Sequence, residues 1–256
     1  MLFRSHLCRV VLTLTDLINS VYPNLENHYS DTKWLSSRMI LCARNDDKNA
    51  LNEELLDKLD GPMHVYLSID SVVNDGFDNI NMPVEVLNAI EMAGIPQHKL
   101  CVKVGAPIMV LRSLDAPKVV NGTRCIVTAL HPNLIEARIS SGKYQGEIIL
   151  IPRIPAIPSE TELAFKMKRL QFPISLCFSM TINKSQGQTF ECVGLHLASP
   201  VFSHGQLYVA LSRVGSPEHV YLCSGDLKSP DVTRNVVYRE VLPSLTQAEQ
   251  MVYENE

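Results

Sequence analysis

The sharpest change of pattern in the chain lies between residues 180 and 181, where a largely apolar run becomes polar. Ile174 to Met180 follows Pro173 and is rich in apolar residues, which predicts a buried strand. The next nine residues, 181–189, read TINKSQGQT, and most of their side chains can form hydrogen bonds. Open α/β sheets bind ligands where a strand gives way to a loop at its carboxyl end. The pattern therefore predicts a ligand-binding loop after this strand.

A second strand and a helix are predicted beyond this loop. Val193 to Leu197 is apolar and predicts the strand, and Gly205 to Val214 predicts the helix. Apolar residues of the helix recur at i, i+3, i+4 and i+7 and define one buried face: Leu207, Ala210, Leu211 and Val214. Arg213 lies off that face. Because a guanidinium held by a packed helix can bind a phosphate through two hydrogen bonds, Arg213 is a candidate phosphate ligand.

The rest of the chain alternates helices and strands before and after a β-rich middle. The pattern predicts a helix over 7–21 that ends at Tyr22-Pro23, a strand over 39–43, helices over about 49–59 and 83–93, and a strand over 220–223. A terminal helix with loose residues is expected beyond Asp226.

The β-rich middle extends from about Leu100 to Pro158. Its β-branched runs predict strands over 108–111, 123–129, 135–139 and 147–151, and Asn121-Gly122 and Ser141-Gly142 are turn signals. Four or five short strands in so few residues predict a small barrel.

Composition narrows the function classes. The 256 residues are 46% hydrophobic and 20% charged, which is typical of a globular protein of one or two domains. The net charge of −4 argues against a protein that grips nucleic acid over its whole surface. Residues 138–169 carry six basic and three acidic side chains, so this window is either a solvated face or a local nucleic-acid footprint.

Cysteines and histidines give no sign of a metal or disulfide site. The seven cysteines include no C-x-x-C pair and predict reduced, mostly buried thiols, and the eight histidines are scattered. No apolar run approaches the roughly 20 residues of a membrane span. We therefore expect no metal, disulfide framework or membrane partner.

Two segments, MTINKSQGQT and HGQLYVALSRV, resemble the fifth and sixth motifs of superfamily-one DNA helicases, specifically the Pif family and its Helitron relatives. The resemblance implies that the first segment contacts single-stranded DNA through Thr181, Asn183, Lys184 and Ser185. It also implies that Gly187 and Gln188 lie on the nucleotide side and that Arg213 is a catalytic arginine finger. Two alternatives remain: residues 183–185 cap the following helix, or Arg213 pairs with Glu218.

Two more segments resemble parts of the same family. The strand and loop around Arg44 resemble the fourth motif, with Ala43 in place of the usual proline, and make Arg44 either a nucleotide contact or an exposed loop residue. The segments KVGAPIMVLRSLD, NGTR and IPRI resemble the Src-homology-3-like insertion that lines the DNA channel in that family.

The resemblance implies an α/β fold, a RecA-like parallel-sheet domain (residues 1–97 and 169–256) with a small inserted Src-homology-3-like β-barrel (98–168). It implies ATP and Mg²⁺ as cofactors, and single-stranded DNA and a first RecA-like motor domain, in cis or in trans, as partners. An intracellular and nuclear location is expected. The N-terminal segment, with two arginines before its first acid, leaves a mitochondrial location open, although a family helix at residues 17–23 explains it too.

The sequence lacks the phosphate cradle of an ATPase, G-x-x-x-x-G-K-[ST], and the only Gly-Lys pair, Gly142-Lys143, has no upstream glycine. We therefore expect the second motor domain of a 5′-to-3′ helicase without the first, and no ATP hydrolysis by the chain alone. A truncated gene, a late start of the gene model and a separate first half remain alternatives. So do two other functions, a non-catalytic single-stranded nucleic-acid-binding module and an inert transposon relic.

Overall fold

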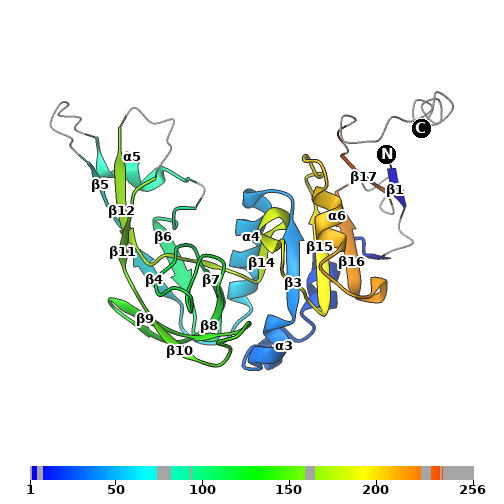
Figure 1. Ribbon diagram of the computed structural model, residues 1–256, viewed down its shortest axis with the longest axis horizontal. Helices are drawn as coiled ribbons and strands as arrows, with labels where there is room; N and C mark the ends of the chain where they lie inside the picture. Colours follow the sequence, from blue (N-terminus) through cyan, green and yellow to red (C-terminus); the bar gives the residue numbers. More distant parts are fainter. Residues whose placement is uncertain are drawn as a thin grey trace. The chain divides into compact units, whose positions relative to one another are not determined.

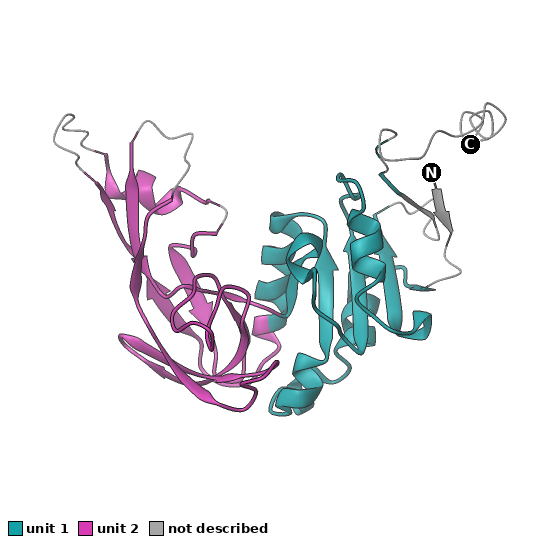
Figure 2. Cartoon of the chain, in the orientation of Figure 1, with its two compact units in different colours: residues 1–55, 178–256 teal, residues 56–177 magenta. Residues whose placement is uncertain are grey.

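The chain folds into two compact units (Figure 2): unit 1, residues 1–55 with 178–256, and unit 2, residues 56–177. The computed structural model describes residues 2–4, 8–73, 82–92, 94–158, 165–225, 232–236 and 238. The predicted boundaries at 97/98 and 168/169 differ from those of the units. Residues 56–97 belong with the β-rich middle because β4 (His64–Leu67) pairs with β6 (Lys99–Val102), and β5 (Ile69–Val72) pairs with β12 (Met167–Gln171).

Unit 1 is built on a five-stranded, wholly parallel sheet in the order β14-β3-β15-β16-β2 (Figure 1). Its strands are β2 (Arg9–Val10), β3 (Arg38–Cys42), β14 (Ser179–Thr181), β15 (Cys192–Leu197) and β16 (Val220–Ser224). Parallel sheets are buried on both faces, and the near-continuous burial of β3 and β15 follows that rule. The predicted α/β parallel-sheet class is confirmed.

Helices of unit 1 connect these strands. They are α1 (Leu14–Val21), α2 (Leu25–His28), α3 (Thr32–Ser36), α4 (Asn45–Asp57) and α6 (Gln206–Leu211). The last two residues of α4 belong to unit 2. Two 3-10 turns, η1 (Ile182–Ser185) and η2 (Pro217–His219), complete the unit. The helix predicted from residue 7 begins instead at Leu14, after the N-cap Thr13, because residues 9–10 pair with β16 as β2. Its predicted end at Tyr22-Pro23 is confirmed.

Close packing places α1 directly on the sheet. A Cβ at Gly194 of β15 would lie 2.8 Å from Cγ2 of Val21, so only glycine lets the helix approach this strand so closely. The hydroxyl of Tyr22, just after α1, donates to the Phe178 carbonyl oxygen at 2.7 Å, which ties the helix end to the start of β14.

The apolar run 174–180 forms two strands instead of the single strand predicted. Its first half, β13 (Ile174–Leu176), pairs antiparallel with β7 (Pro107–Val110) in unit 2, whereas its second half is β14 in unit 1. The Cys177 amide donates to the Pro107 carbonyl at 2.9 Å, and the Ser179 amide donates to Oδ1 of Asn52 at 2.9 Å. The chain therefore changes units within three residues.

Unit 2 contains a five-stranded antiparallel sheet in the order β10-β9-β8-β7-β13, with β10 and β13 at its edges. The remaining strands of this sheet are β8 (Arg124–His131), β9 (Leu134–Ile139) and β10 (Ile148–Pro152). All four predicted β-rich segments are strands here. The β8–β9 connection is a two-residue turn at Pro132-Asn133 that the Gly-based turn signals did not predict.

A second sheet of unit 2 has the strand order β11-β12-β5, in which β11 is Ile154–Ala156, and it contains a buried ion pair. The side chains of Arg169 in β12 and Asp70 in β5 are 1% and 0% exposed, and Nη2 of Arg169 lies 2.8 Å from Oδ2 of Asp70. The same guanidinium donates to the carbonyls of Leu87, Ile90 and Pro96 at 2.9–3.1 Å. Arg169 therefore binds the carboxyl end of α5 (Val84–Ala89), which is shorter than the predicted helix 83–93.

Several remaining expectations concern the ends and the thiols. Five of the seven cysteines are buried, and burial raises the pKa of the Cys42 thiol to about 12.

Val232–Arg234 forms β17, which pairs with β1 (Leu2–Arg4), while most of the predicted terminal helix lies outside the described residues. None of the helices in the described parts of the chain is long and apolar enough to cross a bilayer.

His196 of β15 is a polar group without a described partner. Its Nδ1 atom is buried and has no hydrogen-bond partner among the described residues. Burial lowers the pKa of His196 from its ordinary value of 6.5, and the carboxylates of Asp47 and Glu54 oppose that shift in part. The imidazole is therefore held neutral in the folded protein at neutral pH.

Acidification is expected to destabilise unit 1 partly through His196. Below pH 6.5 the unfolded chain binds a proton at this residue that the folded chain does not, so the free energy of unfolding falls as pH drops toward the lowered pKa. Urea unfolding between pH 7.5 and 5 should be less acid-sensitive in His196→Leu than in the parent. The exposed His219→Leu is the matched control, and equal acid sensitivity of the parent and His196→Leu would reject the assignment.

Candidate nucleotide and nucleic-acid site

Three strand ends meet at one edge of the unit 1 sheet. Thr181, the last residue of β14, pairs in register with Cys42, the last residue of β3, and Cys42 pairs with His196 near the end of β15. The polar loop 181–189 and the loop at Arg44 therefore leave the sheet side by side. This is the edge at which parallel α/β sheets bind ligands.

The polar loop begins with the 3-10 turn η1, which sorts its side chains into two groups. Ile182 and Ser185 are buried, whereas Asn183 and Lys184 are exposed. The Ser185 hydroxyl donates to the Ile182 carbonyl at 2.7 Å, so it closes the turn and does not face solvent. Of the predicted DNA contacts, Asn183 and Lys184 are therefore free to meet a ligand with their side chains, Thr181 is half-buried, and Ser185 is available only through its backbone.

The second half of the loop turns at Gly187. Its φ of 80° lies in the left-handed region that glycine adopts without strain. The Gln188 amide donates to the Ser185 carbonyl at 3.0 Å, and Nε2 of Gln188 donates to the Lys184 carbonyl at 3.3 Å. These bonds fold the loop back on η1.

Arg213, which follows α6, is bonded to the same loop. Its Nε donates to the Val209 carbonyl at 2.8 Å, and its Nη1 donates to the carbonyls of Gln188 at 3.0 Å and Ser185 at 3.4 Å. Nη2 donates to the Ser212 hydroxyl at 2.8 Å. Among the described residues these contacts use four of the five N–H groups and none goes to Glu218, so one Nη2 proton remains for a ligand.

The helix α6 is shorter than predicted, 206–211 instead of 205–214, so Arg213 lies just beyond its end. Leu207 and Ala210 are buried as expected, while Leu211 and Val214 are half-buried. Arg44 lies next to the start of α4, at the end of β3, and its side chain is exposed. Thr181 and Arg44 lie by the carboxyl ends of β14 and β3, and the Arg213 side chain contacts the polar loop that leads from there to β15. The Arg213 backbone itself lies near the amino end of β15, where its carbonyl accepts from the Phe190 amide at 2.9 Å.

One polar residue of this edge was missed from the sequence. Gln206 is 2% exposed, accepts a hydrogen bond from the Phe202 amide at 3.0 Å, and donates to Oδ1 of Asn183 at 3.5 Å. It opens α6 in a segment whose apolar spacing drew attention to the leucines. A buried glutamine has no periodic signal, so only its position before the apolar stripe could have suggested a role.

Comparisons with known proteins find similarity to DNA helicases. The family model described as DNA helicase Pif1, 2B domain, matches residues 85–130, within unit 2. ATP-dependent DNA helicase PIF1 of Danio rerio is 30% identical over 210 residues, which are 77% of this chain and 29% of that protein. Its Homo sapiens counterpart is 31% identical over 69% of this chain and 25% of its own length. These matches support a fragment of a Pif1-family helicase.

The fold of a solved Pif1 helicase also matches. The Bacteroides Pif1 crystallised with ADP-AlF3 and single-stranded DNA superposes with a TM-score of 0.56 at 23% identity, over 96% of this chain and 55% of that one. This likeness supports a RecA-like domain joined to a 2B domain, as units 1 and 2 suggest. The chain spans about a quarter to a third of the length of the two PIF1 relatives.

ATP and Mg²⁺, which the Pif1 resemblance implies, fit the residues of this edge only in part. Arg213, whose second Nη2 proton has no acceptor among the described residues, and the exposed Arg44 suit phosphate oxygens. No cluster of three His, Cys, Asp or Glu side chains in the described ranges could hold a metal ion. Arg213 and Arg44 could thus contact phosphates, while ligands for Mg²⁺ would have to come from elsewhere.

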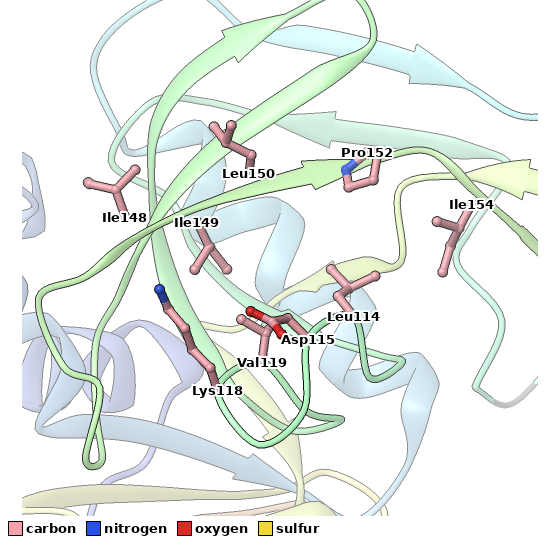
Figure 3. A pocket seen from close by; sticks show the side chains of 9 residues that line it. All are labelled: Leu114, Asp115, Lys118, Val119, Ile148, Ile149, Leu150, Pro152 and Ile154. Carbon is pink, nitrogen blue, oxygen red and sulfur yellow. The ribbon is translucent and has the colours of Figure 1, made fainter.

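Unit 2 has a separate hollow of about 450 Å³ beside β10 and the loop 114–119 (Figure 3). Seven of its nine lining residues are apolar: Leu114, Val119, Ile148, Ile149, Leu150, Pro152 and Ile154. Asp115 and Lys118 also line it, and Nζ of Lys118 lies 2.5 Å from Oε2 of Glu147. A hollow with its cation already paired does not suit a polyphosphate, so it is not the candidate nucleotide site.

Proposed function

We propose that this chain is the part of an ATP-dependent 5′-to-3′ DNA helicase that holds single-stranded DNA and offers an arginine finger to a shared ATP site. In this proposal Asn183 and Lys184 contact the DNA backbone, helped by Thr181 and the backbone of Ser185. Gly187, Gln188, Arg44 and Arg213 face the nucleotide. A first RecA-like motor domain, in cis or in trans, supplies the phosphate loop and the Mg²⁺ ligands.

A single observation carries the proposal: Arg213 donates to the carbonyls of Ser185 and Gln188. The side chain proposed to meet the γ-phosphate is therefore bonded directly to the loop proposed to hold DNA. A shift of Arg213 toward a phosphate would release its bonds to that loop. The same contact offers a physical route by which nucleotide state could change the grip on DNA.

Lys184 is expected to contribute an electrostatic contact to single-stranded DNA. Each neutralised phosphate of a single strand steepens the dependence of log K on log salt by about 0.7. Lys184→Ala should therefore weaken binding of a labelled oligothymidine and make this slope about 0.7 less steep. Fluorescence anisotropy at several salt concentrations measures both quantities.

Lys33→Ala is the matched control for this experiment. Lys33 is also exposed and lies in α3, before the amino end of β3 and hence at the opposite end of the sheet from Lys184. Lys33→Ala should leave the affinity for the oligothymidine and the slope of log K against log salt at the parental values. If Lys184→Ala behaves like Lys33→Ala, the loop is not the DNA site.

A non-catalytic single-stranded nucleic-acid-binding module is the second candidate. The observation in its favour is that Arg213 already has backbone and hydroxyl partners within its own unit, so it has a structural role without nucleotide. Under this alternative Lys184 still contributes to binding, but Arg213 has no effect on turnover. The two candidates separate on the Arg213 variants considered in the Discussion.

A further inference from the structure

Phe202 is an exposed aromatic side chain at the same sheet edge as the polar loop. It lies between β15 and α6, and 56% of its surface is accessible. Val201 just before it is 3% exposed, so the backbone here points one apolar side chain into unit 1 and the next into solvent. Phe202 therefore contributes little to the core, and its ring is available to a ligand.

Gln206 fixes the backbone of Phe202 relative to Asn183. As described above, the buried side-chain amide accepts from the Phe202 amide and donates to Oδ1 of Asn183. A second bond, from the Gln206 amide to the Ser203 carbonyl at 3.2 Å, closes the loop between them. The backbone of Phe202 is thus linked through Gln206 to Asn183, which precedes the exposed Lys184 in the polar loop.

We propose that Phe202 is a stacking platform for one base of a single strand whose backbone lies along Asn183 and Lys184. The inference rests on the proposed function, because it requires that the polar loop binds single-stranded DNA. Non-specific sites for single strands combine cationic or polar groups that follow the backbone with aromatic rings on which bases stack. Every base has a π-face, so such a platform needs no sequence readout and suits a protein that moves along DNA.

Polar surroundings favour a nucleic acid over a protein partner at this ring. Asn183, to which Gln206 links the Phe202 backbone, carries an exposed amide and is followed by the exposed ammonium group of Lys184, whereas a protein-docking patch has a contiguous apolar centre. Gln206 holds the ring through its backbone and leaves the ring itself free. In this scheme Gln206 is a positioning residue and does not touch the DNA.

The test is the affinity of the full chain for a 15-nucleotide fluorescein-labelled oligothymidine at several salt concentrations. Loss of one stacked base costs roughly 5- to 100-fold in affinity. Phe202→Ala and Phe202→Leu should both show this loss with an unchanged salt slope, since no charge is removed. Tyr208→Ala removes another exposed aromatic of the same region, one without a described link to Asn183, and should leave binding unchanged.

Phe202→Trp adds a direct readout. The parent chain has one tryptophan, Trp34, so extra fluorescence in the variant reports on position 202. We expect Phe202→Trp to bind as tightly as the parent and its extra fluorescence to be quenched when the oligonucleotide binds.

The outcomes separate the platform from the function on which it rests. If the parent binds, Lys184→Ala changes the slope and Phe202→Ala keeps parental affinity, the platform is rejected and the proposed function stands. Full retention in Phe202→Leu also rejects stacking, because apolar bulk alone would then suffice. If the parent chain does not bind the oligonucleotide, the proposed function fails and the platform fails with it.

Discussion

Replacing Arg213 by alanine or lysine is expected to lower the rate of ATP hydrolysis at least about 100-fold at saturating ATP and DNA, when a first motor domain completes the site. An arginine finger stabilises charge that develops in the transition state and contributes about 10³ to 10⁵ in rate. Lysine keeps the charge but loses the planar fork that donates to two oxygens, so both variants should fail. The measurement uses a fusion of a first motor domain from a complete Pif1 relative to Met1, with phosphate release as the readout.

Controls for this experiment follow from the contacts of Arg213. The chain alone should release no phosphate, because its sequence contains no G-x-x-x-x-G-K-[ST]. Ser212→Ala removes only the hydroxyl bound to Nη2 and should leave turnover near the parental value. Because Arg213 also holds loop 181–189, the affinity of each variant for DNA must be measured separately, and turnover compared at saturation. An active fusion in which Arg213→Ala or Arg213→Lys retains near-parental turnover would contradict the finger.

Replacing Arg169 by methionine is expected to destabilise unit 2 by about 3–5 kcal/mol. The substitution leaves the Asp70 carboxylate without its cation in a site where both side chains are almost fully inaccessible to water. It also removes the donors from the carbonyls of Leu87, Ile90 and Pro96, which anchor the carboxyl end of α5. Urea denaturation measures the change in the free energy of unfolding.

Lys168→Met is the matched control for Arg169→Met, because Lys168 is the adjacent residue of β12 and is exposed. It should change stability by less than about 0.5 kcal/mol. The double variant Asp70→Leu with Arg169→Met should lose less free energy of unfolding than the sum of the two single variants, because it leaves neither charge buried without its partner. Stability of Arg169→Met within about 1 kcal/mol of the parent would show that the ion pair does not hold this part of unit 2.

Sequence patterns were sufficient to predict elements that local residue patterns define. The strands β3, β15 and β16 were predicted because apolar runs of this length have few alternatives once turns bound them. Arg213 was singled out because it departs from the apolar stripe of the predicted helix, and in the structure it follows α6 and contacts the polar loop.

Other features depend on partners that are distant in sequence. The run 174–180 looks uniform, yet Ile174–Leu176 pairs with β7 and Ser179–Thr181 with β3, and no local signal marks the change. Arg169 was counted in a basic window as a solvated or DNA-facing charge, but its partner Asp70 is 99 residues away and both are buried. Local composition cannot distinguish a solvated arginine from a paired one, because the difference lies in the tertiary contact.

Ser185 and Gln206 illustrate the same limit at the candidate site. Ser185 was placed with the DNA contacts because the loop is polar throughout, but the 3-10 turn rotates its hydroxyl inward onto Ile182. Gln206 was absent from the predicted set because its importance comes from two partners, Phe202 and Asn183, that only the folded loop brings together.

The change of unit between β13 and β14 makes neighbouring amides into independent reporters of local opening. The Cys177 proton exchanges with solvent only when its bond to Pro107 in unit 2 breaks, and the Ser179 proton only when its bond to Asn52 in unit 1 breaks. Deuterium uptake at these two positions, two residues apart, therefore measures the opening free energies of the two units within one short peptide. Where the two rates diverge, the chain is opening as two cooperative blocks; where they coincide, it is opening as one.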